Sequence, residues 1–99
     1  MKVSFSRRAL RDVASISSYI ARANPRASAE VLRRIEETAM LLGEFPDGGH
    51  EVDRAGVRVI TVPQYPYRLF YIVRSNREIL VLNVRHTSRR PLHGRPQSA

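Results

Sequence analysis

The sequence contains no cysteine, which excludes disulfide bonds, zinc–thiolate centres and thiol nucleophiles. Its three histidines (His50, His86 and His93) are too widely spaced to form a ligand cluster. No apolar run approaches the roughly 18–20 residues that a membrane-spanning helix needs. The N-terminal segment also lacks the apolar core and cleavage site of a secretory signal. We therefore expect a cytoplasmic protein with no metal, no cofactor and no membrane partner.

Acidic residues are also scarce, and their scarcity is uneven. The 99 residues include 17 basic and 9 acidic side chains, a net charge of +8, and Lys2 is the only lysine. Residues 1–50 carry 8 bases and 6 acids, whereas residues 51–99 carry 9 bases and 3 acids. Codon usage in a GC-rich genome could favour arginine, but it does not explain why acids are missing from one half. Because arginine pairs bidentately with carboxylate and phosphate, we expect an acidic macromolecular partner.

The first half of the chain predicts a short strand followed by two helices. Lys2–Phe5 alternates polar and apolar residues, as a strand does. Ser6 is a suitable N-cap for a helix over residues 7–22, whose apolar side chains recur every three or four positions. Asn24-Pro25 predicts the start of a second helix, with Asn as N-cap and Pro in the first turn. Gly43 is placed to end that helix in a left-handed conformation.

The second half predicts strands, and the chain length suits a single domain. After a turn-rich connector over residues 45–49, we expect strands at Arg58–Val62, Tyr67–Val73 and Ile79–Val84. The predicted fold class is α+β with the order β-α-α-β-β-β, a helical hairpin packed on one face of a small antiparallel sheet. Residues 1–90 would form this domain, and residues 91–99 a flexible basic tail.

Three arginines start or end the predicted strands, namely Arg58, Arg68 and Arg85. Such an arrangement can converge on a phosphate or on a run of carboxylates. The alternative is that they are ordinary edge residues with solvated heads. Strand alternation places Arg68 on one face with Phe70 and Ile72, and Arg85 on one face with Asn83 and Val81.

Other side chains also admit two interpretations. His86 could transfer protons, because histidine titrates near neutral pH, or could be structural. Tyr65 could stack on a base or a peptide, or could pack against the core. Arg7-Arg8 stands in the first turn of the first helix, where the helix dipole disfavours cations. This departure could serve function, or both side chains could simply be exposed and screened by salt.

Three segments, residues 6–35, 65–73 and 79–91, together resemble the ParE/RelE superfamily of bacterial type II toxins. The resemblance covers about residues 2–91. It implies a growth-inhibiting toxin neutralised by a cognate acidic antitoxin, whose N-terminal half binds DNA. Operator DNA would then be contacted only through the antitoxin. An acidic antitoxin segment that folds on binding fits a basic toxin with one uncovered sheet face.

The superfamily splits by target. RelE-like members cut mRNA on the ribosome, and ParE-like members are described as poisoning DNA gyrase without a recognised nuclease site. Arg68 matches the arginine that nucleolytic relatives use on the penultimate strand, and Arg85 or Arg89 matches a basic residue near the end of the last strand. However, the basic pair of the second strand is reduced to Arg58, and no tyrosine follows His86. The resemblance therefore favours a ParE-like toxin with no intrinsic catalysis and gyrase as its target.

Two alternatives remain open. A RelE-like ribosome-dependent endoribonuclease would need phosphate-binding bases and a proton-transfer group around the 2′-hydroxyl. Its catalytic set would be Arg58, Arg68, Arg85 and His86. A non-catalytic nucleic-acid-binding module is the other alternative, although it lacks an exposed aromatic platform. For the toxin, the expected antitoxin-binding or target-binding residues are Arg58, Arg68, Arg85, Arg89, Arg90 and Tyr65.

Overall fold

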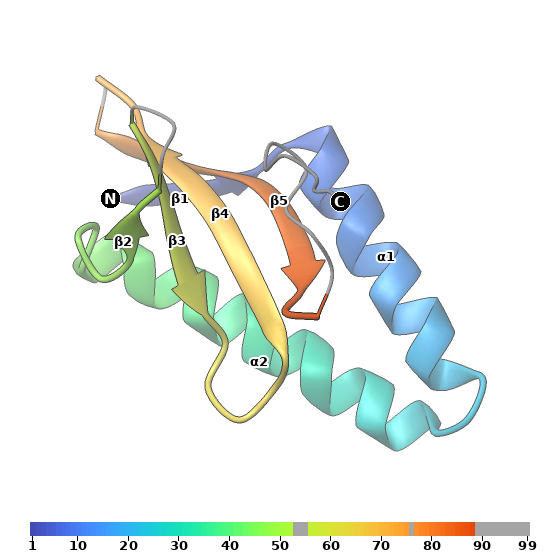
Figure 1. Ribbon diagram of the computed structural model, residues 1–99. Helices are drawn as coiled ribbons and strands as arrows, with labels where there is room; N and C mark the ends of the chain where they lie inside the picture. The colour runs from blue at the N-terminus through green and yellow to red at the C-terminus, as the bar shows by residue number, and fades with distance from the viewer. Residues whose placement is uncertain (53–55, 76, 89–99) are drawn as a thin grey trace, which may run out of the picture.

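The computed structural model describes residues 1–52, 56–75 and 77–88. Its elements, in chain order, are β1 (Lys2–Phe5), α1 (Arg7–Ala21), α2 (Pro25–Glu44), β2 (His50–Glu51), β3 (Val57–Thr61), β4 (Tyr67–Val73) and β5 (Glu78–His86). Both helices lie on one side of the sheet (Figure 1). The α+β class is therefore confirmed. The predicted tail, residues 91–99, lies outside the described residues, and so do Arg89 and Arg90.

The predicted helix starts are confirmed, because both caps form as expected. The Ser6 Oγ accepts a hydrogen bond from the Ala9 N–H at 3.0 Å. The Asn24 Oδ1 accepts one from the Ala27 N–H at 3.1 Å, and Pro25 begins α2. These contacts satisfy backbone donors that have no partner within the helix.

The predicted end of α2 is wrong, because Gly43 lies inside the helix, which continues to Glu44. A Cβ atom on Gly43 would lie 2.7 Å from the carbonyl oxygen of Met1. The ammonium group of Met1 donates a hydrogen bond to the Gly43 carbonyl at 2.8 Å. Glycine at this position therefore allows the start of the chain to pack directly against α2.

The sheet has the strand order β1-β5-β4-β3-β2, so the two strands expected to be central, β4 and β5, are central. Strands β2 to β5 pair antiparallel, but β1 runs parallel to β5, with Lys2 opposite Glu78 and Phe5 opposite Val81. The expected sheet was antiparallel throughout. A parallel pair needs a long crossover connection, which is supplied here by the helices and the other strands. Strand β2 has only two residues, too few for alternation to reveal it.

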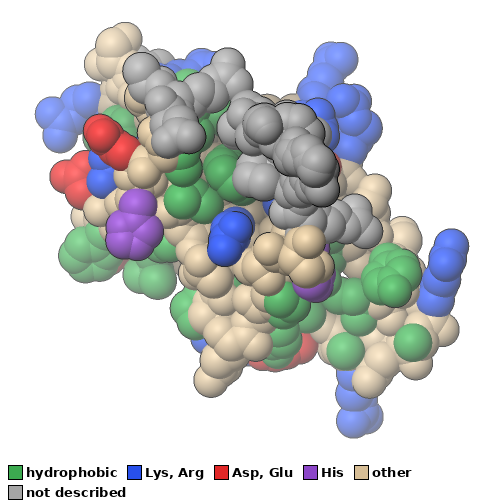
Figure 2. Space-filling view, in the orientation of Figure 1, with side chains coloured by type: hydrophobic (Ala, Val, Ile, Leu, Met, Phe, Trp, Pro, Cys, Tyr) green, Lys and Arg blue, Asp and Glu red, His purple; other side chains and the backbone are tan. Residues whose placement is uncertain are grey.

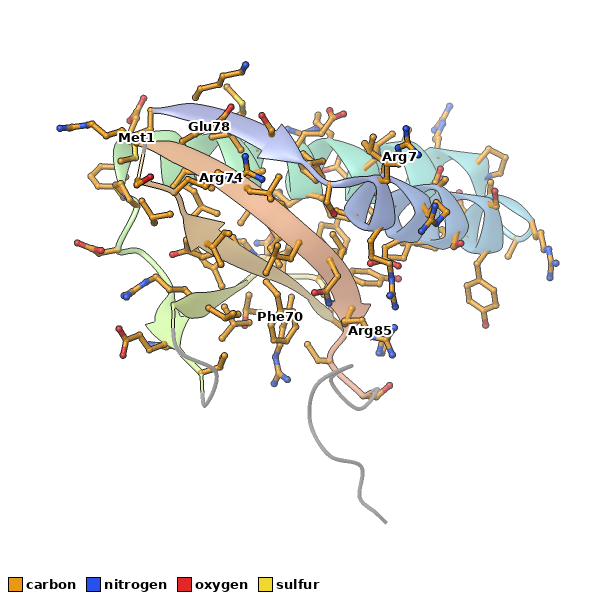
Figure 3. All side chains as sticks on the ribbon, turned by 90° about the horizontal axis from the view of Figure 1, so that it is seen from above. Met1, Arg7, Phe70, Arg74, Glu78 and Arg85 are labelled. Carbon is orange, nitrogen blue, oxygen red and sulfur yellow. The ribbon has the colours of Figure 1, made fainter. Side chains whose placement is uncertain are left out.

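The core lies between the helices and one sheet face. Its members are Ala9, Val31, Ile35, Ala39, Leu42, Val62, Tyr67, Leu69, Tyr71, Ile79, Val81 and Val84. We call the opposite face of the sheet the outer face. It can be followed in Figure 3, where Phe70 and Arg85 project away from the helices.

A β-bulge in β5 decides which of its side chains reach the outer face. Tyr71 pairs with Val81, but the preceding residue, Phe70, pairs with Asn83, so Leu82 is the extra residue. Val81 therefore faces the core, whereas Asn83 lies on the outer face. The prediction that these two residues share a face is wrong, because a bulge reverses the alternation beyond it.

Candidate functional site

The outer face brings two of the predicted arginines together. Arg68 on β4 and Arg85 on β5 are direct cross-strand partners. Side chains opposite each other on neighbouring strands have Cβ atoms about 4.5–5.5 Å apart, and like charges in this position are destabilising. An anion placed between the two guanidinium groups would remove this repulsion and accept hydrogen bonds from both.

A buried amide, that of Asn83, lies beside the arginine pair. Strand alternation correctly predicted that Asn83 shares a face with Arg85, but wrongly put Val81, which faces the core, on the same face. Asn83 pairs with Phe70, and the two residues are only 3% and 4% exposed. The Nδ2 group of Asn83 has no hydrogen-bond acceptor within the described residues. A buried donor without a partner costs about 1–3 kcal/mol. Arg68 and Arg85 therefore offer donors suited to a carboxylate or a phosphate, and the buried Asn83 amide lies beside them.

The edge of β5 that carries Asn83 and Arg85 is held by residues of α1 and its cap. β1 pairs with β5 only as far as Val81. Beyond that point, the Ser6 hydroxyl donates to the Leu82 carbonyl at 2.8 Å, and the Val84 N–H donates to the Asp12 Oδ2 at 2.9 Å. These side chains replace the missing strand partner. Sequence reasoning did not single out Asp12, and only its position on the inward side of the helix pointed to it.

The position of Arg8 in the first turn of α1 is explained by an ion pair with the Asp12 carboxylate. The Arg8 Nε lies 3.4 Å from the Asp12 Oδ1, one helical turn away. The pair offsets the unfavourable position of a cation in the first turn. Arg7 is exposed.

The structure places Arg58 on the other face of the sheet. Arg58 pairs with Tyr71, which belongs to the core. Its guanidinium donates to the Gly49 carbonyl at 2.7 Å and lies 3.7 Å from the Glu51 carboxylate. Arg58 therefore binds the loop between α2 and β2 and does not join Arg68 and Arg85.

His86 also lies on the helix side of the sheet. It pairs with Tyr67, and the two rings pack edge to face with centroids 5.3 Å apart. The Nδ1 atom of His86 accepts a hydrogen bond from the Ser88 N–H at 3.1 Å. A backbone N–H can only donate, so Nδ1 carries a lone pair and the proton of the neutral ring lies on Nε2.

A groove of about 350 Å³ separates α1 from the end of β5, and His86, Tyr67, Arg85 and Asp12 are among its lining residues. The predicted site residue Tyr65 lies elsewhere and packs against the margin of the core. The structure thus brings Arg85 next to both Arg68 and the groove that His86 also lines, but it separates Arg58 and Tyr65 from them.

Within residues 1–52, 56–75 and 77–88, no three histidine or acidic side chains approach closely enough to hold a metal ion. Among the same residues, no helix has the length and apolar character needed to cross a bilayer.

Comparisons with known proteins agree with this architecture. The family described as ParE toxin of type II toxin-antitoxin system, parDE, matches residues 3–91. Y4kP of Sinorhizobium fredii, named as a candidate toxin, is 31% identical over 85 residues, which are 86% of each protein. The structure of the chromosomal ParDE system from P. aeruginosa superposes with a TM-score of 0.78 at 22% identity, covering 89% of this chain and 97% of that one.

The isolated RelE toxin of E. coli shares the fold more distantly. It superposes with a TM-score of 0.65 at 18% identity, covering 93% of this chain and 89% of that one. The family match over nearly the whole chain, together with the curated relative, goes beyond a shared fold. The chain therefore belongs to the ParE toxin family of type II toxin–antitoxin systems, within the ParE/RelE superfamily.

Proposed function

We propose that this toxin arrests growth by binding DNA gyrase, without cutting RNA, and that a cognate acidic antitoxin neutralises it by covering the outer face. The observation that carries the first part is the separation of the candidate catalytic residues. Cleavage at a 2′-hydroxyl requires phosphate-binding bases and proton-transfer groups around one atom. Arg68 and Arg85 lie on the outer face, whereas Arg58 and His86 lie on the helix side.

The two separated side chains are also engaged elsewhere. Arg58 donates to the Gly49 carbonyl, and the Nδ1 atom of His86 accepts from the Ser88 N–H. Moving either residue into a common site with Arg68 would break these bonds and reverse the face of a paired strand. This arrangement supports a toxin that works by binding.

The chemistry of the outer face supports the antitoxin part of the proposal. Arg68 and Arg85 present donors on this face, Ile72 and Leu80 lie on it beside them, and Phe70 and the Asn83 amide are buried between them. An acidic segment with some apolar side chains can satisfy both features. Solved structures that share the fold include a chromosomal ParDE toxin-antitoxin system and the intact RelBE toxin-antitoxin complex of E. coli.

The gyrase proposal is tested with purified toxin in a supercoiling assay. We expect inhibition of supercoiling and accumulation of cleaved DNA. Full supercoiling activity at a large excess of toxin would contradict the proposal. The antitoxin proposal is tested separately by binding to the acidic product of the adjacent reading frame. Reversing the charge of Arg68 and Arg85 should weaken binding, whereas reversing that of Arg26, an exposed arginine of α2, should not.

A ribosome-dependent ribonuclease is the second candidate, and the paired guanidinium groups of Arg68 and Arg85 are the observation that favours it. Two opposed arginines beside a buried amide donor can bind a phosphate as well as a carboxylate. Mapping mRNA ends after expression distinguishes the candidates. Intact transcripts during growth arrest support the binding toxin, and codon-phased cuts that Arg68→Ala abolishes support the ribonuclease.

A further inference from the structure

A second surface, at the C-terminal end of α2, differs from the outer face in both charge and polarity. Of the seven large apolar side chains that are exposed among the described residues, five belong to the C-terminal end of α2 or to segments that adjoin it, and they are Met1, Met40, Leu41, Phe45 and Val73. We call these five residues, with Glu44 and Asp47, the α2-end patch. Figure 2 shows exposed hydrophobic side chains at this end of α2, below β2.

Two members of the α2-end patch, Met1 and Val73, come from other parts of the chain and adjoin the end of α2. The Met1 ammonium is bonded to the carbonyl of Gly43 in the last turn of α2. Met1 and Val73 line the same depression of about 400 Å³, together with Asp47. Figure 3 shows Met1 at the end of the molecule where α2 finishes.

The helix itself presents one continuous apolar and acidic face. At 100° per residue, Met40, Leu41, Glu44 and Phe45 fall within about 140° of the helix circumference. Met40 is 66% exposed and Phe45 is 61% exposed. Contiguous exposed apolar surface of this kind marks an interaction site more often than chance exposure does.

The charge of this region is opposite to that of the rest of the chain. Residues 35–52 contain five acids and no lysine or arginine, in a protein with a net charge of +8. Glu36, Glu44 and Asp47 are exposed, and none of them forms an ion pair with another described residue. The basic residues that follow Met1 and Val73 in the chain, Lys2 and Arg74, share the Glu78 carboxylate, and Arg58 pairs with Glu51.

We infer that the α2-end patch is a docking surface for a basic amphipathic segment of a partner protein. Apolar side chains of the partner would cover Met40, Leu41 and Phe45, and its lysines or arginines would face Glu44 and Asp47. The same acids repel an anionic lipid surface and an acidic antitoxin segment. The surface would thus stay available when the outer face is covered, and it concerns a partner different from the antitoxin.

The inference is tested by nuclear magnetic resonance with the isotope-labelled full chain. The probe is a synthetic amphipathic helix of leucine and lysine, about 18 residues or five turns long, and a leucine and glutamate helix is its matched control. We expect the lysine peptide to shift signals of residues 40–51 and the glutamate peptide to shift those around Arg68 and Arg85. The glutamate peptide tests the outer face, so the two proposals can fail independently.

Two double variants locate the binding surface. One combines Leu41→Ser with Phe45→Ser, and the other combines Glu44→Lys with Asp47→Lys. Each should lower the affinity for the lysine peptide by at least about tenfold, since truncating central anchors or reversing facing charges removes most of an interface's affinity. Their side chains are exposed, so folding should be retained, and a thermal melt checks this. Leu10→Ser is the matched control, because Leu10 on α1 is 57% exposed and Leu41 is 51% exposed.

The control variant should bind within about twofold of the unaltered chain, a difference of about 0.4 kcal/mol. Unchanged affinity in both double variants, or signal shifts spread over the whole surface, would overturn the inference. Reversible association of the chain with itself in the ultracentrifuge, abolished by Leu41→Ser with Phe45→Ser, would also overturn it, because the surface would then belong to a second copy.

Discussion

The hydroxyl group of Tyr71 connects the sheet to the loop between α2 and β2, and removing it should destabilise the protein measurably. Tyr71 is fully buried. Its hydroxyl donates to the Pro46 carbonyl at 2.8 Å and accepts from the Gly49 N–H at 2.9 Å. Tyr71→Phe keeps the ring and its packing, so the change isolates these two hydrogen bonds.

The expected cost follows from the burial of Gly49. A buried donor left without a partner costs about 1–3 kcal/mol, and a second lost hydrogen bond adds about 0.5–1.5 kcal/mol. We therefore expect Tyr71→Phe to lower the free energy of unfolding by about 2–3 kcal/mol. In a domain of this size, each kcal/mol lowers Tm by about 4–8 °C, so Tm should fall by about 10–20 °C.

The assay is urea and thermal unfolding followed by circular dichroism, with amide hydrogen exchange as a local readout. The amide of Gly49 should exchange faster in Tyr71→Phe. Tyr19→Phe is the control, because Tyr19 is 72% exposed and its variant should stay within about 0.5 kcal/mol of the unaltered protein. A Tyr71→Phe protein as stable as that control would show that the two hydrogen bonds do not stabilise the fold.

A substitution at Gly49 would perturb the same loop through a clash with the neighbouring backbone. A Cβ atom on Gly49 would lie 2.4 Å from the Val59 carbonyl oxygen and 2.9 Å from the Tyr71 hydroxyl. Gly49→Ala must therefore push β2 away from β3, and overpacking of this kind costs about 1–3 kcal/mol or more. Gly49→Ala and Tyr71→Phe combined should cost less than the sum of the single changes, because both release the same loop.

Three further predictions concern the ends of β5 and the charged surface. Asp12→Ala should lower the free energy of unfolding, measured in urea, by about 1–3 kcal/mol, because the Val84 N–H of β5 loses its acceptor. Asp12→Asn keeps an acceptor oxygen and should recover part of this free energy. Equal losses in the two variants would contradict the role of this hydrogen bond. Arg68→Leu should leave stability unchanged or raise it by up to about 1 kcal/mol, because the repulsion from Arg85 disappears, while affinity for an acidic peptide falls. The hydrogen bond from Arg33 lowers the pKa of Glu30, so Arg33→Gln should raise that pKa in a carboxyl NMR titration, and an unchanged pKa would contradict this cause.

The sequence predicted the elements that depend on local interactions. Ser6 and Asn24 cap their own helices within three residues, so their role needs no knowledge of the rest of the fold. Strand β4 was predicted with its observed bounds because Tyr67–Val73 is aromatic or apolar at every position except Arg68. Gly43 misled the prediction, since the same residue type that ends helices also allows close packing, here against Met1.

The arrangement of the candidate site could not be predicted in the same way. Alternation from Val81 would have put Arg85 on the core side, and only the extra residue Leu82 places it opposite Arg68. Arg58 has the same chemistry as both, but its register opposite Tyr71 directs it to the loop on the other face. No local pattern distinguishes these three arginines.

The amino-acid pattern alone thus establishes two capped helices, the main strands, the α+β class, a basic second half and the resemblance to this toxin superfamily, because capping, periodicity and charge act over a few residues. Pairing over long sequence distances decides the remainder. It makes β1 parallel to β5, brings Asp12 to the β5 backbone, and places Arg68 and Arg85 side by side. Arg68 and Arg85 share the outer face only because the bulge in β5 reverses the alternation, since a shift of one residue moves every following side chain to the opposite face.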